Sequence, residues 1–139
     1  MNPNPIHRFT PLRDESLTGF TDSPIRPKLI YIAGPYTAEN TYSLRRNILK
    51  AEAAAREVMK HGFVPVIPHS LGDALDTGSK FKHFQHHDWM QKLCLPLLSR
   101  CDGLLLIEGW QNSKGSRIEF DFAQTNNMPI FYKPERIRF

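Results

Sequence analysis

Short apolar runs alternate along the chain with longer amphipathic stretches. The runs cover residues 29–33, 63–67, 103–107 and 129–132, and Gly, Pro or polar residues bound them. Their length and their β-branched and aliphatic content predict four strands, the first of them buried in a parallel sheet. Pro65 lies inside the second run, and because proline cannot donate a ladder hydrogen bond, we expect that strand at a sheet edge.

The amphipathic stretches predict three helices. Residues 41–61 place their apolar side chains on one face and charged side chains on the rest, and Gly62 follows the last turn. A second helix is predicted over 86–99, where Pro96 should bend or shorten it. A third is predicted from Ser116 to about residue 126, opened by a loop over 108–115.

Two segments show neither the alternation of a strand nor the 3.6-residue period of a helix. Residues 68–84 read as a long polar connection, and loops of that length are usually functional or mobile. Residues 1–27 hold five of the eleven prolines. They predict an extended arm, able to wrap the domain or a neighbouring subunit, ahead of a folded domain at 28–139.

Alternation of strands and helices predicts the fold class. We expect an α/β protein: a single Rossmann-like or flavodoxin-like three-layer domain with a mainly parallel sheet of four to five strands and helices on both faces. In such folds ligands bind outside the carboxyl ends of the strands, where the strand order reverses. The positions to inspect therefore follow Ala33, Ile67, Ile107 and Tyr132.

Composition and charge limit the classes of ligand and the location that can be expected for this protein. The net charge of +4 favours anionic ligands, but much of the excess lies near the chain ends, so nucleic acid is not expected. No apolar run approaches the roughly 20 residues of a membrane span, and no signal-peptide core is visible in residues 1–20. Cys94 and Cys101 match neither a redox pair nor a zinc ribbon, which favours a reduced, cytoplasmic protein.

Candidate chemistry gathers after the strands. Gly34-Pro35 follows the first, His69 follows the second, and Trp110 follows the third. Ser113, Gly115 and Ser116 then open the helix that carries Glu119. A Gly/Ser-rich helix start presents free backbone N–H groups and the positive end of the helix dipole, which suits a phosphate or carboxylate. The segment lacks both the P-loop and the dinucleotide-binding fingerprints.

An ordered set of motifs in residues 28–132 resembles the nucleoside 2-deoxyribosyltransferase superfamily. The motifs are Tyr31-Ile-Ala-Gly34-Pro35, Asp88 at a helix start, Cys101-Asp102-Gly103 with its apolar strand, and Ser113-x-Gly115-x-x-x-Glu119-Phe-Asp-Phe-Ala. The resemblance implies cleavage of the N-glycosidic bond of a (2′-deoxy)nucleoside or its 5′-monophosphate. It also implies a homo-oligomer, with neither cofactor nor metal.

The resemblance assigns roles residue by residue. Glu119 matches the nucleophile that attacks the anomeric carbon, and Asp88 matches an aspartate that assists at the base or sugar. Tyr31, Ser113 and Gly115 match the branch that hydrolyses 5′-monophosphates, with the serine and glycine holding the phosphate. Gly34-Pro35 is more like the branch that transfers the sugar to a second base, so the acceptor and the 5′-phosphate stay open.

Each residue also has a structural interpretation. Ser116-x-x-Glu119 fits a capping box, and a glutamate folded back on its own cap is less free to attack. Asp88 could serve its helix dipole, and Tyr31 or Trp110 could simply pack. His83, His86 and His87 suggest a metal, but no pattern completes a ligand set.

Two other function classes stay open. The first is a non-catalytic nucleotide sensor on the same fold, with the Ser113–Ser116 loop holding phosphate and Glu119 only capping. The second is a basic adaptor whose proline-rich arm binds protein or nucleic acid. Release of free base from a nucleoside or nucleotide separates the enzyme from both.

Overall fold

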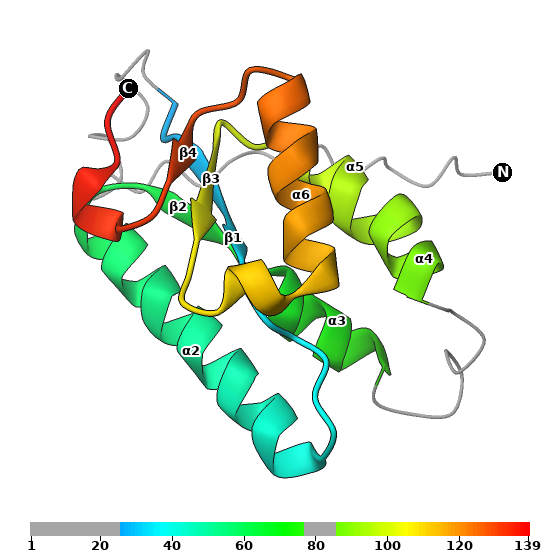
Figure 1. Ribbon diagram of the computed structural model, residues 1–139. Coiled ribbons are helices and arrows are strands. Elements are labelled where there is room, and N and C mark those ends of the chain that lie inside the picture. Colours follow the sequence, from blue (N-terminus) through cyan, green and yellow to red (C-terminus); the bar gives the residue numbers. More distant parts are fainter. Residues whose placement is uncertain (1–25, 77–85) are drawn as a thin grey trace, which may run out of the picture.

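The computed structural model describes residues 26–76 and 86–139 (Figure 1). The strands are β1 (Leu29–Ala33), β2 (Val64–Val66), β3 (Gly103–Leu106) and β4 (Ile130–Phe131), and the longer helices are α2 (Thr41–Lys60), α3 (Pro68–Asp76) and α6 (Lys114–Thr125). The four predicted strands and the helix after the first strand are confirmed. Of the predicted arm at 1–27, residues 1–25 lie outside the described part.

All strand pairs are parallel, in the order β2-β1-β3-β4. This confirms the predicted α/β fold with a parallel sheet. β2 lies at an edge, as Pro65 predicted. An edge strand tolerates proline because its outer side has no neighbouring strand that needs the missing N–H donor. The chain moves from β1 to one side and then returns to the other side with β3. The strand order therefore reverses between the carboxyl ends of β1 and β3, the place where such folds bind ligands.

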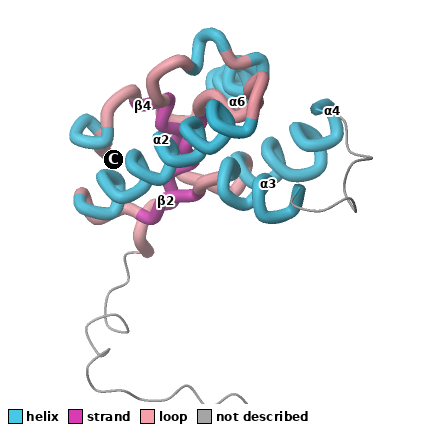
Figure 2. The backbone as a smooth tube through the Cα atoms, turned by 90° about the horizontal axis from the view of Figure 1, so that it is seen from below, coloured by secondary structure: helices cyan, strands magenta, loops and turns pink. Residues whose placement is uncertain are grey.

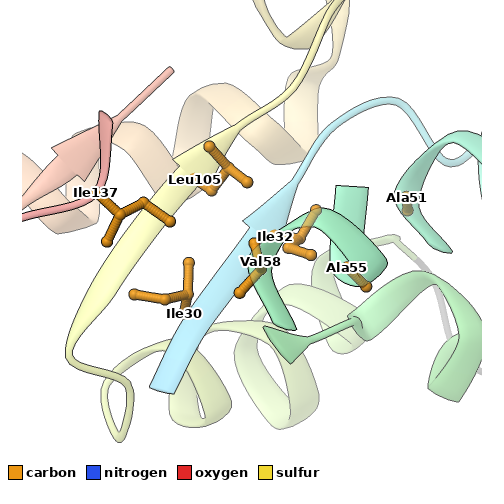
Figure 3. Close-up of a cluster of buried hydrophobic side chains, with 7 residues drawn as sticks. All are labelled: Ile30, Ile32, Ala51, Ala55, Val58, Leu105 and Ile137. Atoms are coloured by element: carbon orange, nitrogen blue, oxygen red, sulfur yellow. The ribbon is translucent and has the colours of Figure 1, made fainter. Parts of the chain in front are cut away.

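Helices cover both faces of the sheet, which gives the three predicted layers (Figures 1 and 2). On one face α2 packs against the first and third strands, in the cluster shown in Figure 3: Ile30, Ile32, Ala51, Ala55, Val58, Leu105 and Ile137. On the other face α5 (Leu95–Leu98) and α6 meet a second cluster: Tyr31, Ala33, Leu98, Cys101, Leu104, Leu106 and Ala123. Because side chains alternate along a strand, β1 sends Ile30 and Ile32 to α2 and Tyr31 to α6.

The predicted polar connection at 68–84 is wrong over its first part, because α3 occupies Pro68–Asp76. Proline at the first helical position has its φ already set and lacks an N–H that would have gone unpaired there. Pro68, His69 and Gly72 are buried. Packing against the rest of the domain therefore outweighs the low helix propensity of Gly72. Residues 77–84 of the predicted connection lie outside the described part.

The predicted helix at 86–99 is continuous but changes its winding. It runs through α4 (His86–Trp89), a π-helical turn at Met90–Cys94 and α5 (Leu95–Leu98). The N–H of Leu95 donates to the carbonyl of Met90, five residues back. This wider turn lies immediately before Pro96, which has no N–H and whose ring crowds the carbonyl four residues earlier. The proline therefore perturbs the helix where the sequence predicted it would.

None of the helices in the described ranges combines the length and the apolarity that a bilayer crossing requires.

Candidate active site

Glu119 faces the sheet from α6 and is only 5% exposed. Its Oε2 atom is buried and has no hydrogen-bond partner. α6 begins two residues earlier than predicted, and its N-cap is Ser113, whose Oγ accepts from the N–H of Ser116 at 3.2 Å. The alternative capping box of Ser116 with Glu119 is therefore wrong. The carboxyl of Glu119, well inside the helix, is not used in a cap.

Tyr31 faces Glu119 from the middle of β1. Its side chain is fully buried, and its hydroxyl also has no hydrogen-bond partner. Burial, then the nearby carboxyl of Glu119 and thiol of Cys94, raise the pKa of Tyr31 well above its usual value. The hydroxyl therefore stays protonated at every physiological pH. Its proton is available to the nearby carboxyl of Glu119.

Burial raises the pKa of Glu119 from 4.5 to about 7, and the Tyr31 hydroxyl acts in the opposite direction. Desolvation penalises the charged form, whereas a donor stabilises it. Near neutral pH the protein therefore holds a buried carboxyl close to its midpoint between the two protonation states. Buried groups whose pKa is shifted toward neutrality are frequent among catalytic residues.

A third titratable group, Cys94, lies near Tyr31 and Glu119. The sequence motifs did not identify it. It comes from the end of the π-helical turn and packs against the core cluster that contains Tyr31. Burial and the charge of Glu119 raise the pKa of the Cys94 thiol to about 11, against a smaller lowering by Tyr31. Its spacing of four from the buried residues Met90 and Leu98 predicts an inward direction. Its neighbours come from other elements and could not be read locally.

The start of α6 carries another buried polar atom. Ser116 is 1% exposed, and its Oγ has no hydrogen-bond partner. Ser113 and Gly115 beside it are half-buried, and Lys114 and Arg117 are exposed. The predicted Gly/Ser-rich helix start is therefore present. The Ser116 amide donates to the cap, and Lys114 and Gly115 occupy the first turn, where helical N–H groups have no intrahelical partner and suit an anion.

Gly34 and Pro35 form the start of the loop after β1, where the strand order reverses. A Cβ added to Gly34 would collide with the side chain of Ile107, so only glycine lets the two loops approach. Gly109 has φ +89°, and a Cβ there would lie 3.0 Å from Cγ of Pro35. The loops after β1 and β3 are thus packed directly on each other.

His69 joins this loop pair from the start of α3. Its Nε2 lies 2.9 Å from the carbonyl oxygen of Gly34, and the ring meets Tyr36 edge-on at 5.9 Å. Burial lowers the pKa of His69, against a smaller effect of the backbone of Gly34 and Pro35. A neutral ring must donate from Nε2 to a carbonyl, which leaves Nδ1 as an acceptor. That Nδ1 is buried and without a partner.

Asp88 and Trp110 have other contacts. Asp88 lies on α4 in the first turn and pairs with Lys92 at 3.6 Å. Trp110 stacks against Phe120 and Tyr132, with ring centroids 4.9 and 6.3 Å apart, which is the packing alternative for that residue. The side chains of His83, His86 and His87 lie outside the described part.

The structure therefore brings together Tyr31 and Glu119 of the predicted catalytic residues, and adds Cys94. Ser116 lies one helical turn before Glu119, on the same face of α6.

Comparison with protein families identifies one family. No curated protein matches the chain. A family model described as "Domain of unknown function (DUF4406)" matches residues 28–132, from the residue before β1 to the residue after β4. The match covers most of the chain and every strand, so the protein belongs to the DUF4406 family.

Proposed function

We propose that this protein cleaves the N-glycosidic bond of a (2′-deoxy)nucleoside or of its 5′-monophosphate, with Glu119 as nucleophile. One observation carries the proposal: a buried carboxyl with an unpaired oxygen lies against a protonated tyrosine, on the helix that follows β3. The sequence resemblance to the nucleoside 2-deoxyribosyltransferase superfamily covers the same residues, 28–132, as the DUF4406 match and supports the proposal.

In the first step the carboxylate of Glu119 attacks C1′ of the sugar. A C–O bond forms, the C1′–N bond breaks, and the base leaves with the bonding electron pair. The sugar becomes positively charged in the transition state, and a nearby carboxylate stabilises that charge before bonding to it. The Tyr31 hydroxyl holds the carboxylate in place and favours its ionised form.

The departing base needs a proton as negative charge builds on its nitrogen. We assign this task to Asp88 on α4, or to a water that it orients, as the resemblance implies. In the second step water or a second base attacks C1′ and returns a proton to Asp88 or to its water, the glycosyl ester breaks, and Glu119 is released as a carboxylate.

Binding would be supplied away from the reacting bond. Ser113, Gly115 and Ser116 at the start of α6 are placed to hold a 5′-phosphate, and the unpaired Ser116 hydroxyl supports this. We assign Gly34, Pro35, His69 and Trp110 to the sugar and base. The Nδ1 acceptor of His69 suits a hydroxyl or amino donor.

The test is incubation with a panel of nucleosides and 5′-monophosphates, followed by chromatography for free base. We expect Glu119→Gln to lower the rate roughly 10³-fold or more, since the nucleophile is lost while its volume is kept. Glu108→Gln is the matched control, because this glutamate is exposed two residues after β3. Full turnover by Glu119→Gln would refute the mechanism. Tight monophosphate binding with no base released would instead favour a nucleotide sensor.

The acceptor and the assembly have their own measurements. Adding a second base to the assay gives a new nucleoside only if the sugar is transferred, and water alone gives free sugar. We also propose a cytoplasmic homo-oligomer: neither Cys94 nor Cys101 is in a disulfide, which agrees with a reducing compartment. Light scattering should give a mass above the 16.0 kDa of one chain.

A further inference from the structure

His69 is a buried histidine whose two ring nitrogens have different surroundings. The side chain is 4% exposed. Its Nε2 lies 2.9 Å from the carbonyl oxygen of Gly34, whereas its Nδ1 is buried and has no hydrogen-bond partner in the described part of the chain. A buried polar atom without a partner costs free energy, and a ligand that completes the hydrogen bond removes that cost. This nitrogen is therefore a candidate ligand contact.

The contact with Gly34 fixes which nitrogen carries the proton. A carbonyl oxygen only accepts, so Nε2 must donate, and in a neutral ring Nδ1 is then an acceptor. Burial lowers the pKa of His69. His69 is also the second residue of α3, where the positive end of the helix dipole disfavours a cation. The neutral ring therefore offers a ligand one acceptor and no free donor.

Packing holds this acceptor in place before a ligand binds. Gly34 lies so close to the side chain of Ile107 that a Cβ on the glycine would collide with it. The Tyr36 ring meets the imidazole edge-on, with 5.9 Å between the ring centroids, and the side chain of Asn47 donates to the Tyr36 carbonyl at 3.2 Å. A preorganised acceptor lowers the entropy cost of recognition.

The acceptor lies within reach of the same ligand as Glu119. α3 packs against β1, and Gly34 follows that strand directly, three positions after Tyr31. Three residues of extended chain span about 10 Å. One nucleotide is long enough to contact both Glu119 and His69.

The chemistry of Nδ1 selects the group of the ligand that it binds. An acceptor repels the oxygens of a phosphate, which also accept, so the 5′-phosphate is not its partner. In the proposed function C1′ lies at Glu119 and the 5′-phosphate lies at the start of α6, so the sugar ring extends along that helix. The C2′–C3′ edge of the ring then remains for other contacts. Its 3′-hydroxyl is a donor that ribose and 2′-deoxyribose share.

We propose that His69 is a specificity-determining residue: its Nδ1 accepts a hydrogen bond from the 3′-hydroxyl of the sugar and so selects nucleotides that carry this group. The inference rests on the proposed function for the placement of the sugar. A site built to bind a hydroxyl rejects the analogue without it, because the buried acceptor is then left unpaired.

The experiment compares nucleotide pairs by calorimetry, in the full chain with Glu119→Gln so that no ligand is consumed. The probes are 2′-deoxyadenosine and 2′-deoxycytidine 5′-monophosphates, each paired with its 2′,3′-dideoxy counterpart. With His69 present, the dideoxy compound should bind at least about tenfold more weakly. His69→Gln keeps an N–H donor near the Nε2 position and has no acceptor at the Nδ1 position. The ratio should therefore fall to about twofold or less.

His61→Gln is the matched control, because His61 is exposed at the end of α2, and the ratio should stay unchanged in this variant. A purely structural role of His69 would weaken both compounds of a pair equally. An unchanged ratio in His69→Gln would therefore overturn the proposal. If this variant fails to fold, nitrogen-15 NMR of the native imidazole decides. A proton on Nδ1 of the free protein, or equal shifts of Nδ1 with both compounds of a pair, would overturn the proposal.

These outcomes are separate from those of the proposed function. Selective binding with no base released by the native protein would refute the enzyme and leave the role of His69 standing. Base release with a ratio near one would refute the role of His69 alone. If His69→Gln instead changed the preference between cytosine and uracil nucleotides, the acceptor would contact a base amino group and the 3′-hydroxyl assignment would be wrong. Absence of binding by every probe would refute both proposals.

Discussion

The two faces of the sheet have equally buried clusters of different composition. Under α2 every buried side chain of the cluster is apolar, from Ile30 and Ile32 of β1 to Val58 of the helix (Figure 3). On the α6 face the same strand contributes the buried Tyr31, and α6 contributes the buried Ser116 and Glu119. Three of the four buried side-chain atoms that lack a partner in the described part lie on this second face, on those three residues.

This difference indicates that one face of the sheet serves stability and the other serves ligand binding. Unpaired buried polar groups cost stability, because they lose their hydrogen bonds to water and gain none in return. A protein retains them where a ligand completes the bonds. The α2 face therefore supplies the stability that the α6 face gives up, and substitutions on the two faces should have opposite signatures.

The largest stability effect should come from the α2 face. Ile32→Ala removes a fully buried side chain from the apolar cluster and should cost about 2–5 kcal/mol of unfolding free energy, from lost burial and the cavity left behind. Denaturant titration measures this loss. The ionisation midpoint of Glu119 should not change. A cost below about 1 kcal/mol would mean that this face is not the stabilising one.

The next largest effect concerns pH on the α6 face. The pKa of Glu119 is raised from 4.5 to about 7 on folding. The folded state therefore holds this proton more tightly than the unfolded state, and stability falls as pH rises through that window, by up to about 3 kcal/mol. The fall is complete above pH 7.

Glu119→Gln isolates this contribution. The variant should gain stability relative to the native protein at pH 8 and equal it near pH 4, as measured by chemical denaturation at both values. His69 acts oppositely: burial lowers its pKa, so its contribution is lost as pH falls below about 6.5. Subtracting the two curves cancels that contribution. A pH-independent difference would contradict the assignment.

Tyr31→Phe should have a smaller effect, which acts through the ionisation of Glu119. It removes the donor that favours the Glu119 carboxylate, so the pKa of that carboxyl should rise by on the order of one unit. The pH profile of kcat/KM should move upward by the same amount. The free energy of unfolding should change little near pH 4, where Glu119 is largely protonated in both states, and should fall by about 1.4 kcal/mol above pH 8, where the raised pKa disfavours the folded carboxylate. An unchanged pKa of Glu119 in this variant would show that Tyr31 mainly packs.

The smallest effect compares the two helix caps. Ser113→Ala on α6 and Asn40→Ala on α2 each remove an oxygen that accepts from a backbone N–H, at 3.2 and 2.8 Å. Each should cost about 1 kcal/mol in thermal or denaturant unfolding. Only Ser113→Ala should also weaken binding of a 5′-monophosphate relative to the nucleoside, as calorimetry can measure. Equal effects on binding would place the phosphate elsewhere.

Local sequence determined much of this protein. Period-2 and period-3.6 patterns found all four strands, the helix from Thr41 and the edge position of β2, since those features follow from propensity and proline chemistry within a few residues. The same pattern located Glu119 on a helix after a strand and Tyr31 on the first strand.

Tertiary structure decided the rest. α3 replaced a predicted loop because buried contacts of Pro68 and His69 outweigh weak local propensity. The α6 cap fell on Ser113 rather than Ser116, which released Glu119 from a structural role. The neighbours of Cys94 come from residues 63 positions earlier and 25 positions later in the chain. Local patterns carry no information on such contacts. The ionisation of Glu119 depends on its burial, which is a property of the whole fold.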